Sequence, residues 1–331
     1  MMPLTLSLAC VPSDRIRPIL DGRVRIEGCV IEPALGEPEA IFGRALSTAE
    51  FAVTELSMAS HIVRVANGTA AYAGVPAFTS RAFRHGSIFI RTDRGITRPE
   101  DLAGRRLGVP DYQQTAALWM RGILSEQYDV PPDSIRWLTG GLDHPVEGQR
   151  GGLTLPPHID VAAVGPGDCL NDALKRGEID GIIAPKPPAC FVDGSAPVAR
   201  LFPDFGAVER RFAEASGFFP IMHCMAVRRD LAQEHPWLPL AVFRAFAEAK
   251  ALALKELVPT NVLRLSLPWL SEHAAEARRI LGARFWSYGL PENKREIEAM
   301  IRYAASDGLI ASPISAAALF AASTHNLEDV A

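Results

Sequence analysis

The N-terminal part of the chain alternates short apolar strands with short helices, and this rhythm narrows the fold more than any other feature. Strand patterns occupy residues 4–11, 24–31 and 51–56, and helical patterns occupy residues 38–46 and 60–65. When strands and helices alternate in short units, the strands form a parallel sheet that helices cover on both faces. The sequence therefore predicts an α/β fold.

Two lobes are expected, because 331 residues exceed the usual size of one hydrophobic core. Turn-rich and Pro-rich segments break the rhythm close to residue 94 and over residues 185–197. We therefore predict that lobe one comprises residues 1–93 and 191–331, and that lobe two comprises residues 94–190. Two α/β lobes joined by two crossings describe a bilobal binding-protein architecture, in which a ligand cleft lies between the lobes at the carboxyl ends of strands.

The composition excludes several classes of protein. A net charge of −4 and a pI near 6.1 provide no basic field for nucleic acid or an anionic membrane. No apolar run approaches the roughly 18 residues of a membrane span. The five cysteines are scattered without a CxxC pair, and the first strand alternates where a secretory signal would form an apolar block. We therefore expect a cytoplasmic protein without a nucleic-acid or membrane partner.

The motifs of the common cofactor sites are missing from the sequence. It contains no GxxxxGK[ST], no GxGxxG after a strand, no HExxH and no GxSxG. The eight histidines are dispersed, so their spacing supports no metal site. We therefore predict that the protein needs neither a cofactor nor a metal ion.

Within residues 217–229, the strand pattern from Pro220 to Val227 is apolar except for the imidazole of His223. A buried imidazole must find a hydrogen-bonding partner or stay neutral at a cost in free energy. One interpretation is a core histidine that bonds a backbone carbonyl, and the other is a histidine that belongs to a functional site. The spacing alone favours the core histidine.

Charged groups follow two of the predicted strands. Arg81, Arg84 and His85 lie close together in an extended, aromatic-rich segment over residues 78–90, and arginines beside a cleft suit a ligand with two carboxylates. Glu55 closes the third strand, where it could orient an imidazole or bind a hydroxyl. The alternative for all four is a solvated edge of the protein.

The predicted second lobe contains a strand over residues 106–109 that leads into a helix over residues 115–128, and Tyr112, Gln114 and Thr115 lie where the helix begins. Free N–H groups at the start of a helix favour anions, and these side chains add donors. An ordinary helix cap explains the same residues equally well.

Several blocks of sequence, found in order along nearly the whole chain, resemble the 4,5-dihydroxyphthalate decarboxylases. The blocks are Ser80-Arg81-Ala82-Phe83-Arg84-His85, Tyr112-Gln113-Gln114-Thr115-Ala116-Ala117, Gly177-Glu178-Ile179-Asp180, Arg200-Leu201-Phe202-Pro203-Asp204, Gly217 to His223, His235-Pro236-Trp237, Pro268-Trp269 and Tyr288-Gly289. The resemblance implies the fold of type II periplasmic solute-binding proteins of the thiamine-precursor and sulfonate group. It also implies a carboxy-lyase that acts on a hydroxylated aromatic acid.

With that reaction in view, chemical inference assigns a role to each candidate residue. His223 would donate a proton to the ring, and the Arg81 and Arg84 side chains would clamp a carboxylate. Either His85 or Glu55 would bind or deprotonate the phenol. Tyr112, Gln114 and Thr115 would contact the substrate from lobe two.

Three questions stay open at this stage. A metal held by His85, His223 and Glu55 could also polarise the phenol, although the spacing does not indicate it. A non-catalytic solute-binding protein for an aromatic carboxylate or sulfonate is the alternative function, because a fold alone does not fix an activity. An assembly of identical chains also stays open.

Overall fold

The computed structural model describes residues 3–146 and 154–329, and both of the units into which the chain divides are α/β structures. The predicted α/β fold class is therefore confirmed. Each unit is discontinuous in sequence: unit 1 comprises Met1–Ala82, Ala213–Glu298 and Ile314–Ala331, and unit 2 comprises Phe83–Phe212 and Ala299–Pro313.

The unit boundaries differ from the predicted crossings near residues 93 and 191. The strand β5 (Ile88–Arg91) pairs with β9 (Gly181–Ile183) and with β10 (Val198–Arg200), so these segments belong to the sheet of unit 2. Residues 299–313 also belong to unit 2, where Asp307 forms a buried ion pair with Arg121. The boundaries depend on which distant strands pair with one another, and the composition of the turns does not predict that pairing.

Unit 1 is built on a five-stranded sheet with the strand order β2-β1-β3-β11-β4. Its strands are β1 (Leu4–Cys10), β2 (Cys29–Leu35), β3 (Val53–Ser57), β4 (Tyr72–Arg81) and β11 (Ile221–Arg228). β1 runs parallel to both β2 and β3, whereas β11 runs antiparallel to β3 and β4. β2 lies on one side of β1 and β3 lies on the other side. The order in which the chain adds strands therefore reverses at β1, which makes the gap between β1 and β3 a topological switch point.

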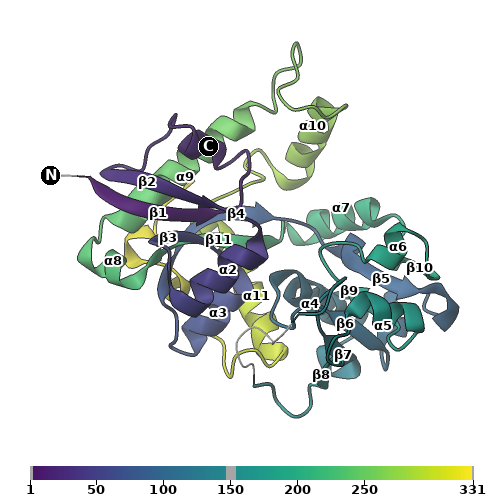
Figure 1. The fold of residues 1–331 in the computed structure, drawn as a ribbon. Helices are drawn as coiled ribbons and strands as arrows, with labels where there is room; N and C mark the ends of the chain where they lie inside the picture. The colour runs from purple at the N-terminus through teal and green to yellow at the C-terminus, as the bar shows by residue number, and fades with distance from the viewer. Residues whose placement is uncertain (1–2, 147–153, 330–331) are drawn as a thin grey trace. The chain divides into compact units, whose positions relative to one another are not determined.

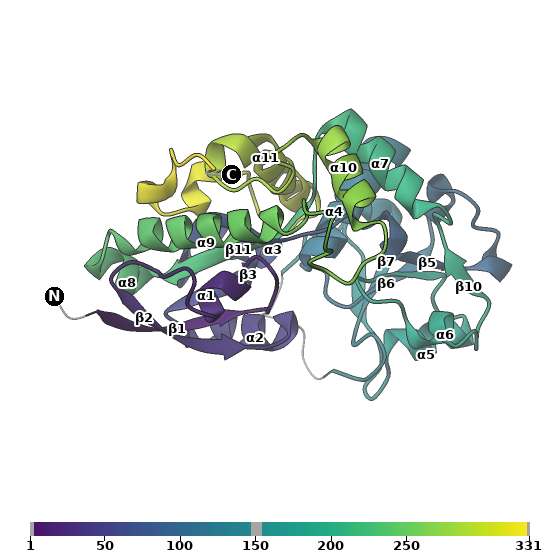
Figure 2. The ribbon, with the colours of Figure 1, turned by 90° about the horizontal axis from the view of Figure 1, so that it is seen from above.

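Helices cover both faces of this sheet. α2 (Pro38–Thr48) and α3 (Met58–Ala66) lie on one face and α9 (Leu238–Lys255) lies on the other, as Figures 1 and 2 show. The remaining α-helices that belong wholly or partly to unit 1 are α1 (Arg17–Leu20), the end of α7 (Phe205–Ser216), α8 (Arg229–Glu234), α10 (Leu270–Leu281) and the first part of α11 (Leu290–Ser306). Apolar residues of α2, such as Ile41 and Ala45, pack with Ala226 of β11 in the core.

Unit 2 contains a six-stranded sheet with the strand order β10-β5-β9-β6-β7-β8. Its other strands are β6 (Arg106–Val109), β7 (Arg136–Thr139) and β8 (Val161–Ala163), and its helices are α4 (Thr115–Tyr128), α5 (Leu170–Arg176), α6 (Ala189–Val192) and most of α7 (Phe205–Ser216). One side of the core comes from α5 and β9, through Leu170, Leu174 and Ile182.

The second strand begins five residues later than the sequence pattern predicts. The pattern indicated residues 24–31, but β2 begins at Cys29, after Gly28 in a left-handed conformation at φ 72°. Val24 and Ile26 are buried in the turn before the strand, so their apolar character reports packing and not strand structure. Pro33 is tolerated inside β2 because β2 is an edge strand.

Within residues 3–146 and 154–329, no helix combines the length and the apolar character that a membrane crossing requires.

Candidate active site

Two ionisable side chains of unit 1, Glu55 and His223, lie together at the edge of the sheet where β1 and β3 end. Val11 follows β1, Glu55 and Ser57 lie at the end of β3, and His223 lies at the start of the antiparallel β11. His223 is paired with Ser57, and Met225 with Glu55, which brings the imidazole and the carboxylate onto one face of the sheet. This edge includes the switch point between β1 and β3, where the strand order reverses, and α/β sheets bind ligands at such points.

Glu55 and His223 form a hydrogen-bonded pair. His223 Nδ1 lies 2.7 Å from Glu55 Oε1, and the backbone N–H of Val11 donates to Glu55 Oε2 over 2.9 Å. The Glu55 side chain is 2% exposed and that of His223 is 17% exposed. The carboxylate is therefore fixed through both of its oxygens, whereas the imidazole remains partly accessible to solvent.

The electrostatics of the pair keep the carboxylate ionised. Burial raises the pKa of Glu55, but the hydrogen bond and the charge of His223 together with the Val11 N–H outweigh it, so the pKa lies below its usual value. An ionised carboxylate only accepts hydrogen bonds, so the Nδ1 atom of His223 carries a proton and donates it. The lone pair of the neutral ring is therefore on Nε2.

Phe42 of α2 fixes the imidazole from a second direction. Its ring meets the ring of His223 edge to face, with centroids 4.8 Å apart and an interplanar angle of 84°. The side chain of Phe42 is buried in the core that α2 forms against the sheet. A hydrogen bond and an aromatic contact thus set the orientation of His223.

The two cysteines close to this edge are not nucleophiles. Burial, with a smaller contribution from the charge of Glu55, raises the pKa of Cys10 to about 12. Cys224 is fully enclosed, and its pKa is raised for the same two reasons. Both thiols are protonated at neutral pH, so neither offers a thiolate.

Arg81, a predicted substrate ligand, lies in unit 1 but is bonded to the protein. Its side chain is 1% exposed and forms an ion pair with Glu296 over 3.1 Å. Its terminal nitrogens also donate to the carbonyls of Phe219 and Ser287, at 2.7 and 2.8 Å, and to Oδ1 of Asn293. Because Glu296 Oε1 accepts the N–H of Ile221 as well, this network ties the start of β11 to α11. The geometry favours a structural role for Arg81.

Arg84 and His85 belong to unit 2, so the structure does not unite them with Glu55 and His223 in one unit. His85 is fully buried between the rings of Phe202 and Phe212, and among the described residues neither of its nitrogens has a hydrogen-bonding partner. Burial lowers the pKa of His85 to about 4, so its ring is neutral. The catalytic role of His85 and the substrate contact of Arg84 stay predictions.

Tyr112, Gln114 and Thr115 also lie in unit 2. Tyr112 is buried, with its ring 3.9 Å from the guanidinium of Arg121, and burial raises its pKa. Gln114 precedes α4 without a side-chain cap, and Thr115 is the first residue of the helix. Their predicted contact with a ligand stays a prediction.

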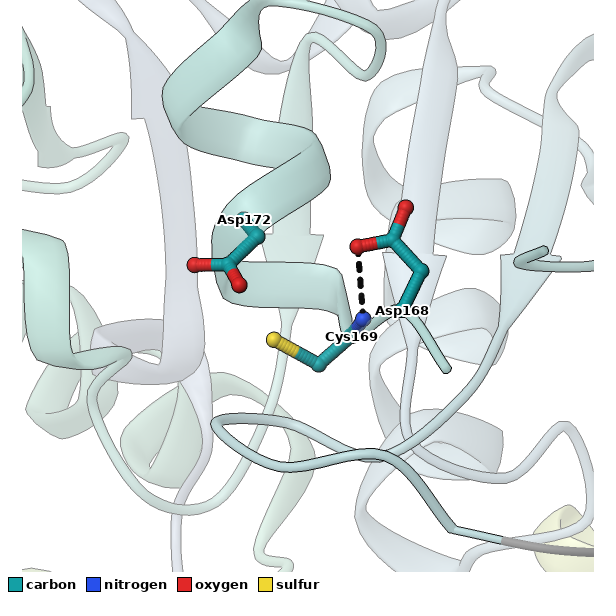
Figure 3. Close-up of side chains that lie close together, drawn as sticks. All are labelled: Asp168, Cys169 and Asp172. Carbon is teal, nitrogen blue, oxygen red and sulfur yellow. Dashed lines mark hydrogen bonds between the residues drawn. The ribbon is translucent and has the colours of Figure 1, made fainter. Parts of the chain in front are cut away.

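One cluster of potential metal ligands occurs in the described residues, and Figure 3 shows it at the start of α5: Asp168, Cys169 and Asp172. Asp168 is already paired with Arg176 and bonded to the N–H of Cys169. Burial raises the pKa of the Cys169 thiol, which disfavours the thiolate that a metal would need. We therefore assign no metal to this cluster.

Glu55 and His223 were thus identified from the sequence and lie together in the structure, whereas the Val11 N–H and Phe42 were not identified. Val11 could have been found, because it follows the strand beside Glu55 at a predicted sheet edge. Nothing in the sequence of α2 distinguishes Phe42 from other core residues.

Comparison with known proteins identifies two close relatives. A 4,5-dihydroxyphthalate decarboxylase from Comamonas testosteroni is 41% identical over 322 residues, which cover 97% of each chain. One of the same name from Pseudomonas putida is 41% identical over 206 residues, covering 62% of this chain and 79% of the relative. No protein-family model matches the chain.

The fold is also similar to that of solved binding proteins. The alkanesulfonate-binding protein SsuA from Xanthomonas axonopodis pv. citri has a TM-score of 0.53 at 13% identity, covering 97% of this chain and 99% of that one. The aliphatic sulphonate binding protein SsuA from Escherichia coli has a TM-score of 0.52 at 13% identity, covering 99% and 95%. At this identity the similarity concerns the fold alone, and it confirms the predicted periplasmic-binding-protein-like architecture.

Proposed function

Because the chain belongs to the family of 4,5-dihydroxyphthalate decarboxylases, and is therefore a carboxy-lyase, we propose that it converts 4,5-dihydroxyphthalate into 3,4-dihydroxybenzoate (protocatechuate) and CO2. Each carboxylate of this substrate is para to a hydroxyl group. That arrangement lets a hydroxyl supply electrons to the carbon that loses CO2.

The proposed reaction begins with protonation of the ring carbon that carries the carboxylate. The para hydroxyl gives up its proton, its electrons move through the ring, and the carbon takes a proton from an acid of the protein. The quinoid intermediate then expels CO2, the electron pair of the broken bond restores the aromatic ring, and the resulting phenolate oxygen regains a proton from solvent. This sequence of steps needs no organic cofactor or metal, and we propose that the enzyme uses none.

In this proposal, His223 is the acid and Glu55 is its positioning residue. The protonated ring keeps its Nδ1 bond to Glu55, and the negative charge of the carboxylate stabilises the positive imidazole. The proton on Nε2 is the one that moves to the substrate. The single observation that carries this assignment is the 2.7 Å bond to a buried carboxylate, made by an imidazole that is still 17% exposed.

Replacement of His223 tests the assignment. We expect His223→Asn to fold normally and to lower CO2 release from 4,5-dihydroxyphthalate by about 10²–10⁴-fold, the usual contribution of a general acid. His273→Asn is the matched control, because His273 is exposed on α10 and should retain full activity. Unchanged turnover in His223→Asn would remove the imidazole from the mechanism.

Glu55→Gln tests the role of the carboxylate separately. The variant keeps a group that can bond Nδ1 but loses the charge that stabilises the protonated ring, so kcat should fall. The alkaline limb of the pH–rate profile, where the acid loses its proton, should move toward lower pH, because the variant no longer stabilises the positive ring. A purely structural role would change stability and leave the position of that limb unaltered.

The alternative function is a non-catalytic receptor for an aromatic carboxylate or sulfonate, and the similarity to sulfonate-binding proteins extends only to the fold. The family membership favours the enzyme. Titration with dihydroxyphthalate and hydroxybenzoates, followed by calorimetry and CO2 detection, separates the two functions, since a receptor would bind without turnover. The proposal includes a cytoplasmic location, which cell fractionation would check.

A further inference from the structure

Arg15 lies in the segment of unit 1 that follows β1, and its guanidinium is only partly enclosed by the protein. The same segment contains Val11, whose N–H donates to Glu55. The Arg15 side chain is 17% exposed, whereas that of Arg81 is 1% exposed and lies in an ion pair with Glu296. Arg15 therefore combines a permanent positive charge with access to a ligand, which Arg81 lacks.

The carbonyl group of Thr79 holds the guanidinium beside the strand position opposite His223. Arg15 Nε and Nη2 donate to this carbonyl oxygen over 3.2 and 3.0 Å. Thr79 directly precedes Ser80, the residue of β4 that pairs with His223. The Thr79 side chain also lies close enough to Glu55 to lower the pKa of that carboxyl group. One residue thus contacts Arg15 through its backbone and the Glu55–His223 pair through its side chain.

Stacking on Trp286 fixes the plane of the guanidinium. The Cζ atom of Arg15 lies 3.9 Å from the centroid of the indole ring, and the indole Nε1–H donates to the carbonyl of Phe78 over 2.8 Å. Of the five N–H groups that a guanidinium carries, two donate to Thr79 and one to Asp14. One N–H on each terminal nitrogen therefore has no acceptor among the described residues, and paired N–H groups of this kind bind carboxylates.

A second polar group of the same segment lacks a hydrogen-bonding partner. The hydroxyl oxygen of Ser13 is enclosed, and it forms no hydrogen bond with any described residue. A buried hydroxyl without a partner is costly in free energy, and a ligand that completes the hydrogen bond removes that cost. Because Ser13 lies between Val11 and Arg15 in the chain, the segment that bonds Glu55 also offers a hydroxyl and a guanidinium to a ligand.

We propose that Arg15 binds the carboxylate that 4,5-dihydroxyphthalate keeps, and that this contact selects aromatic acids with two adjacent carboxylates. The inference rests on the proposed function and deepens it. Loss of CO2 turns a charged carboxylate into a neutral molecule, so a cation on that carboxylate would stabilise the substrate more than the transition state. The carboxylate that is kept stays negative throughout, so a cation there holds the substrate without opposing the reaction. Ser13 donates its hydroxyl proton to the same carboxylate.

Replacement of Arg15 by methionine tests the contact, because methionine keeps an unbranched side chain beside Trp286 but carries no charge. We expect Arg15→Met to raise the KM for 4,5-dihydroxyphthalate by about 10–100-fold, the usual value of a hydrogen bond to a charged group, and to change kcat much less. Arg17→Met is the matched control, because Arg17 is exposed two residues along the chain and the variant should keep the wild-type KM.

Calorimetric titration with two ligands separates recognition of the carboxylate from a structural role of Arg15. 3,4-Dihydroxybenzoate retains the carboxylate that Arg15 binds in this proposal, whereas catechol is the same ring without it. Arg15→Met should weaken the binding of 3,4-dihydroxybenzoate by about 10–100-fold and leave the binding of catechol unchanged. Arg15→Lys keeps the charge but not the paired N–H groups, so its loss of affinity for 3,4-dihydroxybenzoate should be intermediate.

The titrations need no turnover, so this inference and the proposed function can fail separately. Wild-type protein that binds 3,4-dihydroxybenzoate through Arg15 but releases no CO2 from dihydroxyphthalate would overturn the proposed function and support the Arg15 contact. If the wild type releases CO2 and Arg15→Met keeps its KM and both affinities, the Arg15 contact is overturned and the decarboxylase stands. Equal weakening of catechol and 3,4-dihydroxybenzoate in Arg15→Met and Arg15→Lys would show a structural role and overturn the contact as well.

Discussion

His85 is a polar side chain that unit 2 encloses without a hydrogen bond for either ring nitrogen among the described residues. An unsatisfied buried polar group costs about 1–3 kcal/mol. At the residue scale, His85 therefore contrasts with His223, which has a charged partner and partial exposure. Burial alone does not make a histidine functional, but burial together with a specific partner indicates a site.

We expect His85→Leu to raise the free energy of unfolding by about 1–3 kcal/mol, because the apolar side chain suits the contacts with Phe202 and Phe212. Urea unfolding checks this prediction. Full decarboxylase activity in the stabilised variant would exclude the predicted catalytic role of His85, and a lower urea midpoint would contradict the prediction.

The advantage of His85→Leu should grow as the pH falls. The pKa of His85 is lowered to about 4 in the folded protein, so the unfolded chain binds this proton first, from about pH 6.5 downward. The wild type therefore loses stability between about pH 6.5 and pH 4, and the variant escapes that loss. Unfolding curves at several pH values should show the difference widening by up to about 1.4 kcal/mol per pH unit.

At the scale of elements, two glycines of unit 1 differ in whether their surroundings leave room for a side chain. Gly43 lies in α2, and an added Cβ would meet nothing within 4 Å. Gly74 lies in β4, where an added Cβ would be 2.5 Å from the carbonyl oxygen of Leu319 and 2.9 Å from Nε2 of His61. Those two atoms are hydrogen-bonded to each other at 2.7 Å, so the strand and the C-terminal segment can approach only at a glycine.

Alanine substitutions at these two positions form a matched pair. Gly43→Ala should stabilise the protein by about 0.5–1 kcal/mol, because alanine is the better helix residue. Gly74→Ala should destabilise it, because the new methyl group separates β4 from Leu319 and disturbs the bond to His61. Thermal unfolding of both variants is the measurement, and equal effects of the two substitutions would refute this account.

At the scale of the whole molecule, a buried ion pair ties distant parts of unit 1 together. Lys250 of α9 pairs with Asp329 near the end of the chain, and both side chains are fully buried. Lys250 also donates to the carbonyl of Trp286 over 3.1 Å, and Asp329 accepts the N–H of Tyr288 over 2.9 Å. Three segments that are far apart in sequence thus meet at two charges.

Breaking this pair should cost far more than breaking a surface pair. Asp329→Ala leaves a buried lysine without a counter-ion, and we expect a loss of about 3–5 kcal/mol in the free energy of unfolding. Lys294→Ala removes the exposed Lys294–Glu298 pair and should change it by less than about 1 kcal/mol. Guanidinium denaturation of both variants measures the difference. The double variant Lys250→Met with Asp329→Ala should recover part of the lost free energy of unfolding, because it leaves no unpaired buried charge.

The sequence by itself determined the elements whose signals are local. The predicted strand over residues 106–109 and helix over residues 115–128 coincide with β6 and α4, because an apolar pattern sets such bounds over a few neighbouring residues. It also indicated Glu55 and His223, since each is a titratable group in an apolar strand.

Only the tertiary structure decided which of these groups meet. Glu55 and His223 are 168 residues apart, and they touch because β3 and β11 are neighbours in one sheet. Arg81 was grouped with them by its charge, yet it is bonded to Glu296 of α11, and His85 lies in the other unit. Pairing between distant strands depends on the packing of a whole core, and no short stretch of sequence contains that information.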